Sequence, residues 1–84
     1  MNPGVGAIVR YRLSADDTRR IRAQRDATAG LYGEAPQVAE LVPAVVLREM
    51  DGGLVLQAWP LGNDSLYVAA ASEGGDEGQW EASS

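Results

Sequence analysis

Hydrophobic and polar residues follow a repeating pattern in the second half of the chain, and this pattern predicts a β-meander. Three apolar runs of strand length cover residues 41–47, 54–59 and 66–71, and Gly-bearing turns at 51–53 and 62–64 separate them. Short apolar runs bounded by such turns are typical of consecutive antiparallel strands. Because the runs are apolar on nearly both faces, we expect the sheet to curl into a small barrel of SH3-like or OB-like kind.

Alternation within these runs assigns side chains to the two faces of the sheet. The two prolines limit where their strands can be paired. Pro43 and Pro60 each lack a backbone N–H, so we expect them at strand ends or on a sheet edge. The alternation places Ala44, Val46 and Met50 on one face of the first run, Leu54, Leu56 and Ala58 on one face of the second, and Leu66, Val68 and Ala70 on one face of the third.

The first third of the chain predicts a strand at residues 7–13, followed by a helix from about Ala15 to about Ala27. Ser14 stands at the N-cap position with Asp17 three residues later, which is a capping box with the shorter acid. The apolar stripe of the helix is narrow, so we expect the helix to lie on the surface. The strand has Val9, Tyr11 and Leu13 on one face and Arg10 and Arg12 on the other, and spacing along the helix predicts the ion pairs Asp16–Arg20 and Arg22–Asp26.

The remaining segments are polar or rich in glycine, so we expect one domain at residues 7–71, an N-terminal arm at 1–6 and a Gly-rich tail at 72–84. The loop at 28–37 contains Tyr32, which either covers the barrel or contacts a partner. In the tail, Trp80 is a large aromatic that we expect to dock, on its own barrel or on a neighbouring subunit. A last strand around 79–81 would fit either arrangement. The expected element order is therefore β-α-β-β-β with a possible C-terminal strand, a mainly β fold with one helix (α+β).

Composition argues against an enzyme, and we expect no cofactor and no metal site. The 84 residues include no Cys, no His and no Lys, which removes the thiolate, the imidazole base and the amine used in most nucleophilic and acid–base catalysis. The acidic turns at 51–53 and 62–64 lack the ligand pattern of a calcium loop and serve well as hairpin turns. The chain also has no apolar run of signal-peptide or membrane-span length, so we expect it in a cytoplasm or in particles assembled there.

Charge is distributed unevenly along the chain. Residues 1–26 contain six Arg and three Asp, a net charge of +3, whereas residues 27–84 contain one Arg and nine carboxylates, a net charge of −8. A polyanion would be repelled by the protein as a whole and could bind only through the first third. The exclusive use of Arg favours defined contacts with carboxylates or phosphates, although a GC-rich coding sequence would also produce it.

Four short motifs follow one another between Leu41 and Trp80. They are, in order, Pro43-Ala44-Val45-Val46, Leu56-Gln57-Ala58, Gly62-Asn63-Asp64 with an aromatic at Tyr67, and Glu73-Gly74 followed by Gly78-Gln79-Trp80. This set resembles a family of short proteins encoded in tailed bacteriophage and prophage genomes, in which Trp is usual at the position of Tyr67. The resemblance covers about half of the chain and implies a phage setting and a small β-rich fold, without implying an activity.

Two hypotheses of function follow. The first is a structural accessory protein of a phage virion, such as a capsid decoration (cement) or minor head protein, which binds other virion proteins, above all the major capsid protein. Self-association is a second contact that this hypothesis allows. The second is a module that binds nucleic acid or a host factor through the Arg-rich first third. Neither involves a membrane. The candidate partner-binding residues are Arg10, Arg12, Arg19, Arg22, Arg25, Tyr32 and Trp80.

Overall fold

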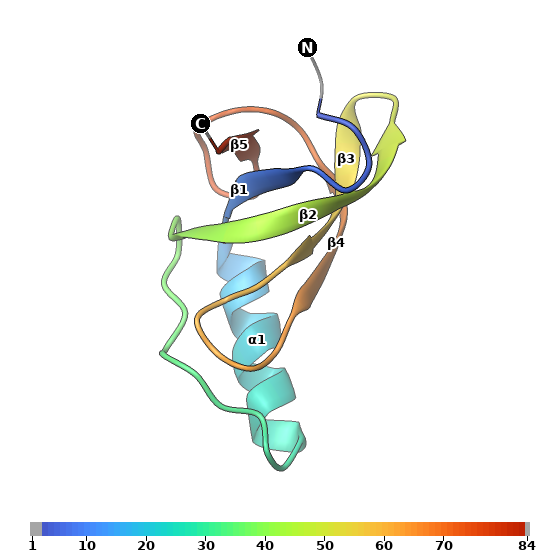
Figure 1. Cartoon of the computed structure of the whole chain (residues 1–84). Helices are drawn as coiled ribbons and strands as arrows, with labels where there is room; N and C mark the ends of the chain where they lie inside the picture. Colours follow the sequence, from blue (N-terminus) through green and yellow to red (C-terminus); the bar gives the residue numbers. More distant parts are fainter. Residues whose placement is uncertain (1–2, 84) are drawn as a thin grey trace.

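The computed structural model describes residues 3–83, which form one antiparallel sheet and one helix (Figure 1). The strand order across the sheet is β4-β3-β2-β1-β5. The predicted class, mainly β with one helix, is confirmed, and the predicted C-terminal strand is present. In chain order the elements are β1 (Ile8–Arg12), α1 (Ala15–Ala27), β2 (Leu41–Met50), β3 (Gly53–Ala58), β4 (Leu66–Ala71) and β5 (Trp80–Ala82).

The sheet is curled but not closed, so it does not form the complete barrel that the apolar runs suggest. β4 and β5 are its two edge strands and do not form a ladder with each other. One isolated bridge between Glu73 and Trp80 joins the segment after β4 to β5. The backbone N–H of Trp80 donates to Ser72 O (3.0 Å), and the N–H of Gly74 donates to Trp80 O (3.0 Å).

Helix α1 begins and ends where its sequence predicts. Ser14 Oγ accepts the backbone N–H of Asp17 (3.0 Å), and Asp17 Oδ2 accepts the backbone N–H of Ser14 (2.8 Å), which completes the capping box. The ion pairs differ from those expected: Asp16 pairs with Arg19 at 3.3 Å, and Asp17 with Arg20 at 3.8 Å. Both observed pairs have i,i+3 spacing, which also brings side chains together on a helix.

The meander of β2, β3 and β4 contains two register shifts, and these change which residues face the core. The β2–β3 shift lies between Val46 and Arg48, and beyond it Met50 is exposed instead of continuing the buried face. In the β3–β4 pair, Leu54 pairs with Ala71 and Leu56 pairs with Val68, so β4 contains one extra residue between these two pairs. Its effect is that Ala71, and not the expected Ala70, is buried. An extra residue in one strand of a pair breaks the strict alternation of faces. This explains why Met50 is exposed and why Ala71 is buried in place of Ala70.

The two prolines lie where a missing backbone N–H costs little. Pro60 follows the end of β3, as predicted. Pro43 lies inside β2, but the last β2–β3 pair is Ala44–Ala58, so Pro43 sits beside the end of β3. Its carbonyl accepts the N–H of Trp59 (2.9 Å). The nitrogen of the same residue points to the same side, beyond the last residue pair of the β2–β3 ladder, so its missing N–H breaks no hydrogen bond within that ladder.

Both ends of the described chain are tied to the sheet. In the expected arm, Gly6 N–H donates to Val46 O (2.8 Å), and Ala7 O accepts the N–H of Val46 (2.9 Å). Residues 1, 2 and 84 lie outside the described residues. In the expected tail, β5 pairs with β1 through Val9–Ala82, Arg10–Glu81 and Tyr11–Trp80. Residues 80–82 of the tail are therefore part of the sheet.

Trp80 is the largest side chain of the core, and only 3% of its surface is exposed. Of the two expected docking sites, this places the indole on its own domain. The core otherwise contains mostly aliphatic residues from β1 to β4, with Ile21 as the contribution of α1. Its members are Val9, Tyr11, Leu13, Ile21, Val42, Ala44, Val46, Leu54, Leu56, Ala58, Leu66, Val68, Ala71 and Trp80.

The helix gives the molecule its elongated shape, with extents of 39 × 22 × 22 Å. In Figure 1, α1 extends away from the sheet, and the segment that follows it returns along the side to β2. Thirteen residues of α-helix span about 20 Å, half of the long dimension. Among the described residues, no helix has the length and apolar character needed to cross a membrane.

Replacing Trp80 tests whether the C-terminal strand belongs to the core. We expect Trp80→Ala to lower the free energy of unfolding by about 3–5 kcal/mol, because it removes a buried aromatic side chain. Urea denaturation followed by circular dichroism measures this. Trp59→Ala is the matched control, because 41% of the Trp59 side chain is already exposed, and we expect a loss of about 1 kcal/mol. Equal losses in the two variants would contradict the placement of Trp80.

Candidate protein-interaction surface

Arg10 and Arg12 point away from the core on β1, as predicted, but both guanidinium groups contact Glu81 of the neighbouring strand. Arg12 Nη2 lies 2.7 Å from Glu81 Oε1, and Arg10 Nη2 lies 3.7 Å from Glu81 Oε2. Arg10 and Glu81 are direct cross-strand partners, a position in which opposite charges attract. The positive charge on β1 is therefore partly neutralised by β5.

The helix arginines also contact groups within the chain. Arg19 pairs with Asp16 on the exposed side of α1. Arg20 donates from Nη2 to the carbonyl of Tyr67 on the edge strand β4 (3.2 Å). Arg22 donates from Nη2 to the carbonyl of Pro36 (3.3 Å), which holds the loop after α1 against the helix. The contacts of Arg20 and Arg22 fasten the helix to its surroundings, and the three arginines do not assemble a single basic surface.

Arg25 forms the most buried ion pair among the described residues. Its Nε and Nη2 donate to Asp64 Oδ2 (2.9 Å) and Oδ1 (3.0 Å), a bidentate arrangement. The Asp64 side chain is 2% exposed and the Arg25 side chain 11%. Nη1 of Arg25 also donates to the carbonyl of Glu34 (2.7 Å). One guanidinium group thus joins the end of α1, the following loop and the loop between β3 and β4.

Two glycines allow these loops to meet over Arg25. Gly33 and Gly62 form an isolated antiparallel bridge. A Cβ atom at Gly33 would lie 2.6 Å from Arg25 Nη2, and one at Gly62 would lie 2.7 Å from the same atom. Only glycine permits so close an approach. The Gly62-Asn63-Asp64 motif is therefore more than a turn, because it closes the domain against the loop at 28–37.

Tyr32 owes its position to the same contact. Asn63 Oδ1 accepts the backbone N–H of Tyr32 (2.9 Å), and Asn63 Nδ2 donates to Gly30 O (2.9 Å). The backbone of the loop is held, while the Tyr32 side chain is 70% exposed. Of the two alternatives for this residue, the structure excludes the one in which its ring folds back over the core.

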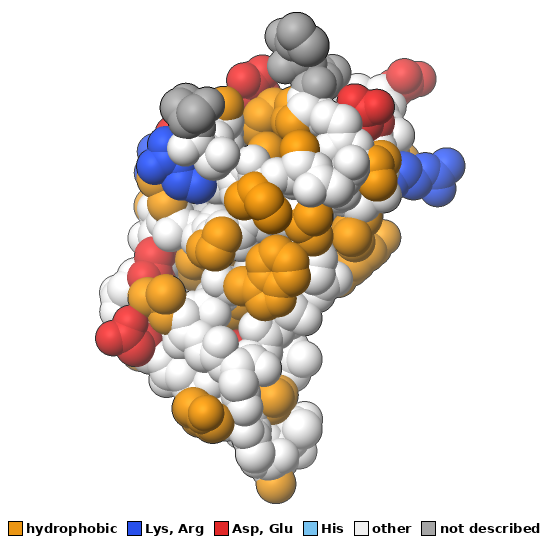
Figure 2. All heavy atoms as spheres, viewed as in Figure 1, with side chains coloured by type: hydrophobic (Ala, Val, Ile, Leu, Met, Phe, Trp, Pro, Cys, Tyr) orange, Lys and Arg blue, Asp and Glu red, His pale blue; other side chains and the backbone are white. Residues whose placement is uncertain are grey.

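The outer face of the sheet carries an exposed apolar surface that the sequence prediction missed. Ile8, Val45, Gln57 and Tyr67 are successive cross-strand partners from β1 to β4, so their side chains share one face. The expectation that curling would cover both faces of the meander is wrong for this face, because it lies on the outside of the curled sheet and nothing in the described residues covers it. Figure 2 shows hydrophobic side chains gathered across the face over which β2 runs. We call Ile8, Pro43, Val45, Leu47, Trp59 and Tyr67 the outer face.

The outer face brings several exposed apolar side chains together. Trp59 and Tyr67 are 41% and 52% exposed, and Ile8 and Leu47 are exposed as well. Large apolar side chains that lie singly on a surface are common, but a contiguous group of them marks an interaction site. The sequence contained one signal for this surface, because the meander strands are apolar on both faces and only one face can point toward the core.

The seven candidate residues do not form one site. Arg10 and Arg12 lie on β1, Arg19 lies on the exposed side of α1, and the contacts of Arg22 and Arg25 connect α1 to the loops. Trp80 is buried, so it presents almost no ring surface to a partner. Within residues 3–83, no group of three or more potential metal-ligating side chains occurs.

Comparison with known proteins found no relative. No family model matches the chain, and the searches of curated proteins and of solved structures gave no match. The observations that bear on function are therefore the exposed surfaces of the structure and the motifs described above.

The Arg25–Asp64 pair predicts strong coupling between two residues far apart in the sequence. We expect Arg25→Met and Asp64→Asn each to lower the free energy of unfolding by about 3 kcal/mol, because each removes a partner from a buried ionic contact. The double variant should lose little more than either single variant. Urea denaturation of all four proteins measures the coupling. As a control, Asp16→Asn in the exposed pair should cost less than about 1 kcal/mol. Additive losses at Arg25 and Asp64 would contradict the contact.

Tyr11 predicts a loss of stability at alkaline pH. Burial raises the pKa of the Tyr11 phenol well above its usual value of 10.0, and the hydrogen bond from its O–H to Asp17 raises the pKa further. The unfolded chain releases this proton near pH 10, before the folded chain does, so stability is complete below pH 10 and falls as the pH rises above it. In Tyr11→Phe, the free energy of unfolding should lose this part of its dependence on pH above 10. Unchanged dependence in urea titrations at pH 9–11 would contradict the assignment.

Proposed function

We propose that this chain is a structural accessory protein of a bacteriophage virion, either a capsid decoration (cement) protein or a minor head protein. It acts by binding other virion proteins, above all the major capsid protein, through the outer face. The observation that carries the proposal is the uncovered apolar surface on the open sheet, in which Trp59 and Tyr67 are the two aromatic side chains. The phage setting is supported by the motif resemblance between Leu41 and Trp80.

The size of the protein suits this role. Its accessible surface is 4879 Å², and a standard protein interface takes about 800 Å² from each partner, about a sixth of that surface. One standard interface would therefore cover only a minor part of the molecule's surface. Trp and Tyr are among the residues that contribute most to binding energy at interfaces, especially when apolar neighbours exclude water around them.

Contacts of the arginines weigh against nucleic acid as the main partner. Arg10, Arg12, Arg19, Arg22 and Arg25 all bind acceptors within the chain. Phosphate binding would have to compete with these contacts, and in the case of Arg25 it would break a buried ion pair. The net charge of −5 adds a general repulsion.

Mass spectrometry of purified phage particles tests the location. We expect the protein in particles from the phage or prophage that encodes it, in a constant ratio to the major capsid protein. Absence from purified particles would refute the virion role.

A pair of tyrosine variants tests the surface. We expect Tyr67→Ala to weaken binding to particles by at least about 10-fold, because it removes an exposed aromatic from the outer face. Tyr32→Ala is the matched control, because Tyr32 is an equally large exposed aromatic outside that face. It should leave binding unchanged. Co-sedimentation of each purified variant with particles gives the affinity. Loss of binding in Tyr32→Ala alone would move the interface to the loop at 28–37.

A further inference from the structure

The outer face consists of two halves with different side chains. Its aliphatic residues lie on β1 and β2, where Ile8 pairs with Val45. Its two aromatic residues lie beyond them across the sheet, with Trp59 directly after the end of β3 and Tyr67 on the edge strand β4. The face therefore presents an aliphatic half and an aromatic half side by side.

The polar side chains within and beside these two halves already have partners. Gln57 lies in the middle of the row of cross-strand partners, and its Nε2 donates to Ser65 Oγ (2.6 Å). At the β1 side of the face, Arg10 lies 3.7 Å from Glu81. A second apolar surface could therefore cover the face without separating either pair.

Charge makes this face the favourable side for contact between two copies of the chain. The protein has a net charge of −5, so two copies repel each other in general. The six residues of the outer face are uncharged, and at its margin Arg10 and Glu81 neutralise each other. Two copies that meet through this face therefore bring no like charges together at its centre.

The positions of the two halves suit a two-fold contact. In such a contact the same patch is used by both copies, so each residue meets a different residue of the other copy. A two-fold axis parallel to the strands, between β2 and β3, places β1 of one copy over β4 of the other. Tyr67 then lies over Ile8 of the second copy and Trp59 over Pro43, because the backbone N–H of Trp59 donates to Pro43 O and aligns these two residues across the sheet. Each aromatic half covers an aliphatic half.

We propose that a second copy of this chain covers the outer face of the free protein through this two-fold contact, and that phage particles displace it. The displacement rests on the proposed function, whereas the dimer does not. The face lies on the outside of a curled sheet, so two copies diverge away from the axis. The contact is therefore smaller than the total of about 1,600 Å² in a standard interface, and we expect a dissociation constant of about 100 µM.

Sedimentation equilibrium of the purified chain between about 10 µM and 1 mM measures this association. Tyr67→Ala should raise the dissociation constant of the dimer by about 10-fold or more. Tyr32→Ala is the matched control and should have no effect, because this exposed aromatic lies outside the face. Added NaCl should strengthen the dimer, since it screens the repulsion between two chains of charge −5.

A spin label tests how the two copies are oriented. The chain contains no Cys, so Ile8→Cys provides a single site for a nitroxide label. In a mixture of this labelled variant with the ¹⁵N-labelled natural chain, the amide signal of Tyr67 should broaden more than that of Ile8, because the two-fold contact places these two residues over each other. The same label on Asp26→Cys, near the end of α1, is the control and should broaden neither signal.

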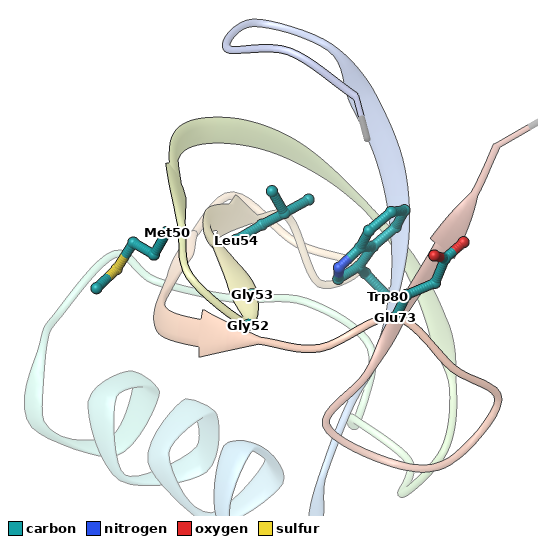
Figure 3. A pocket seen from close by; sticks show the side chains of 6 residues that line it. All are labelled: Met50, Gly52, Gly53, Leu54, Glu73 and Trp80. Atoms are coloured by element: carbon teal, nitrogen blue, oxygen red, sulfur yellow. The ribbon is translucent and has the colours of Figure 1, made fainter. Parts of the chain in front are cut away.

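The two indole N–H signals give a second reading from the same spectra. Trp59 lies on the outer face, and its signal should broaden with that of Tyr67. Figure 3 shows the indole of Trp80 inside the curl of the sheet, on the same side as Leu54. The Trp80 signal should therefore broaden less than the Trp59 signal.

The possible results separate the dimer from the proposed function. A monomer at about 1 mM, a dimer that Tyr67→Ala leaves intact, or a dimer that salt weakens would overturn the dimer and leave particle binding untouched. Stronger broadening of Ile8 than of Tyr67 would overturn the two-fold arrangement. Failure to co-sediment with particles would overturn the proposed function and the displacement, with the dimer still standing. A Tyr67→Ala chain that loses the dimer but still binds particles would show that the two contacts use different surfaces, which overturns the displacement.

Discussion

Burial of Trp80 is the interaction on which the rest of the structure depends. An 84-residue chain has little apolar surface to bury, and its core is otherwise built mostly from Val, Leu and Ala. The indole comes from near the C-terminal end and packs into this core opposite Tyr11. To place it there, β5 must pair with β1, which brings Glu81 beside Arg10 and Arg12. The glycine-rich segment before β5 is thereby drawn into the domain.

This arrangement divides the molecule into groups that hold the fold and groups that remain free to bind. The arginines of the first third are engaged within the chain, and Arg25 in particular connects α1 to two loops through Asp64. The open sheet leaves Trp59 and Tyr67 uncovered on the opposite side from the core. Contacts with other proteins would therefore use the outer face, without unfolding any part of the domain.

The sequence predicts the features that depend on neighbouring residues. The helix follows from Ser14 and Asp17, and the meander follows from its turns, because both signals act over a few positions. Strict alternation is wrong for Met50 and Ala70, since each register shift changes the pairing by one residue. The Arg25–Asp64 pair has no local signal, because 39 positions separate its members. Apolar residues on both faces of the meander predict burial by closure, but they are equally compatible with an open sheet and an exposed face.

Hydrogen–deuterium exchange of the free chain tests most directly whether the C-terminal segment belongs to the fold of a single molecule. The amide of Trp80 donates to Ser72 O, that of Gly78 to Arg12 O and that of Arg12 to Gln79 O. These three amides should exchange with the same opening free energy as those in the centre of β3, because removal of β5 exposes the core. Exchange of the Trp80 and Gly78 amides at the rate of an unstructured peptide, with β3 still protected, would contradict the account.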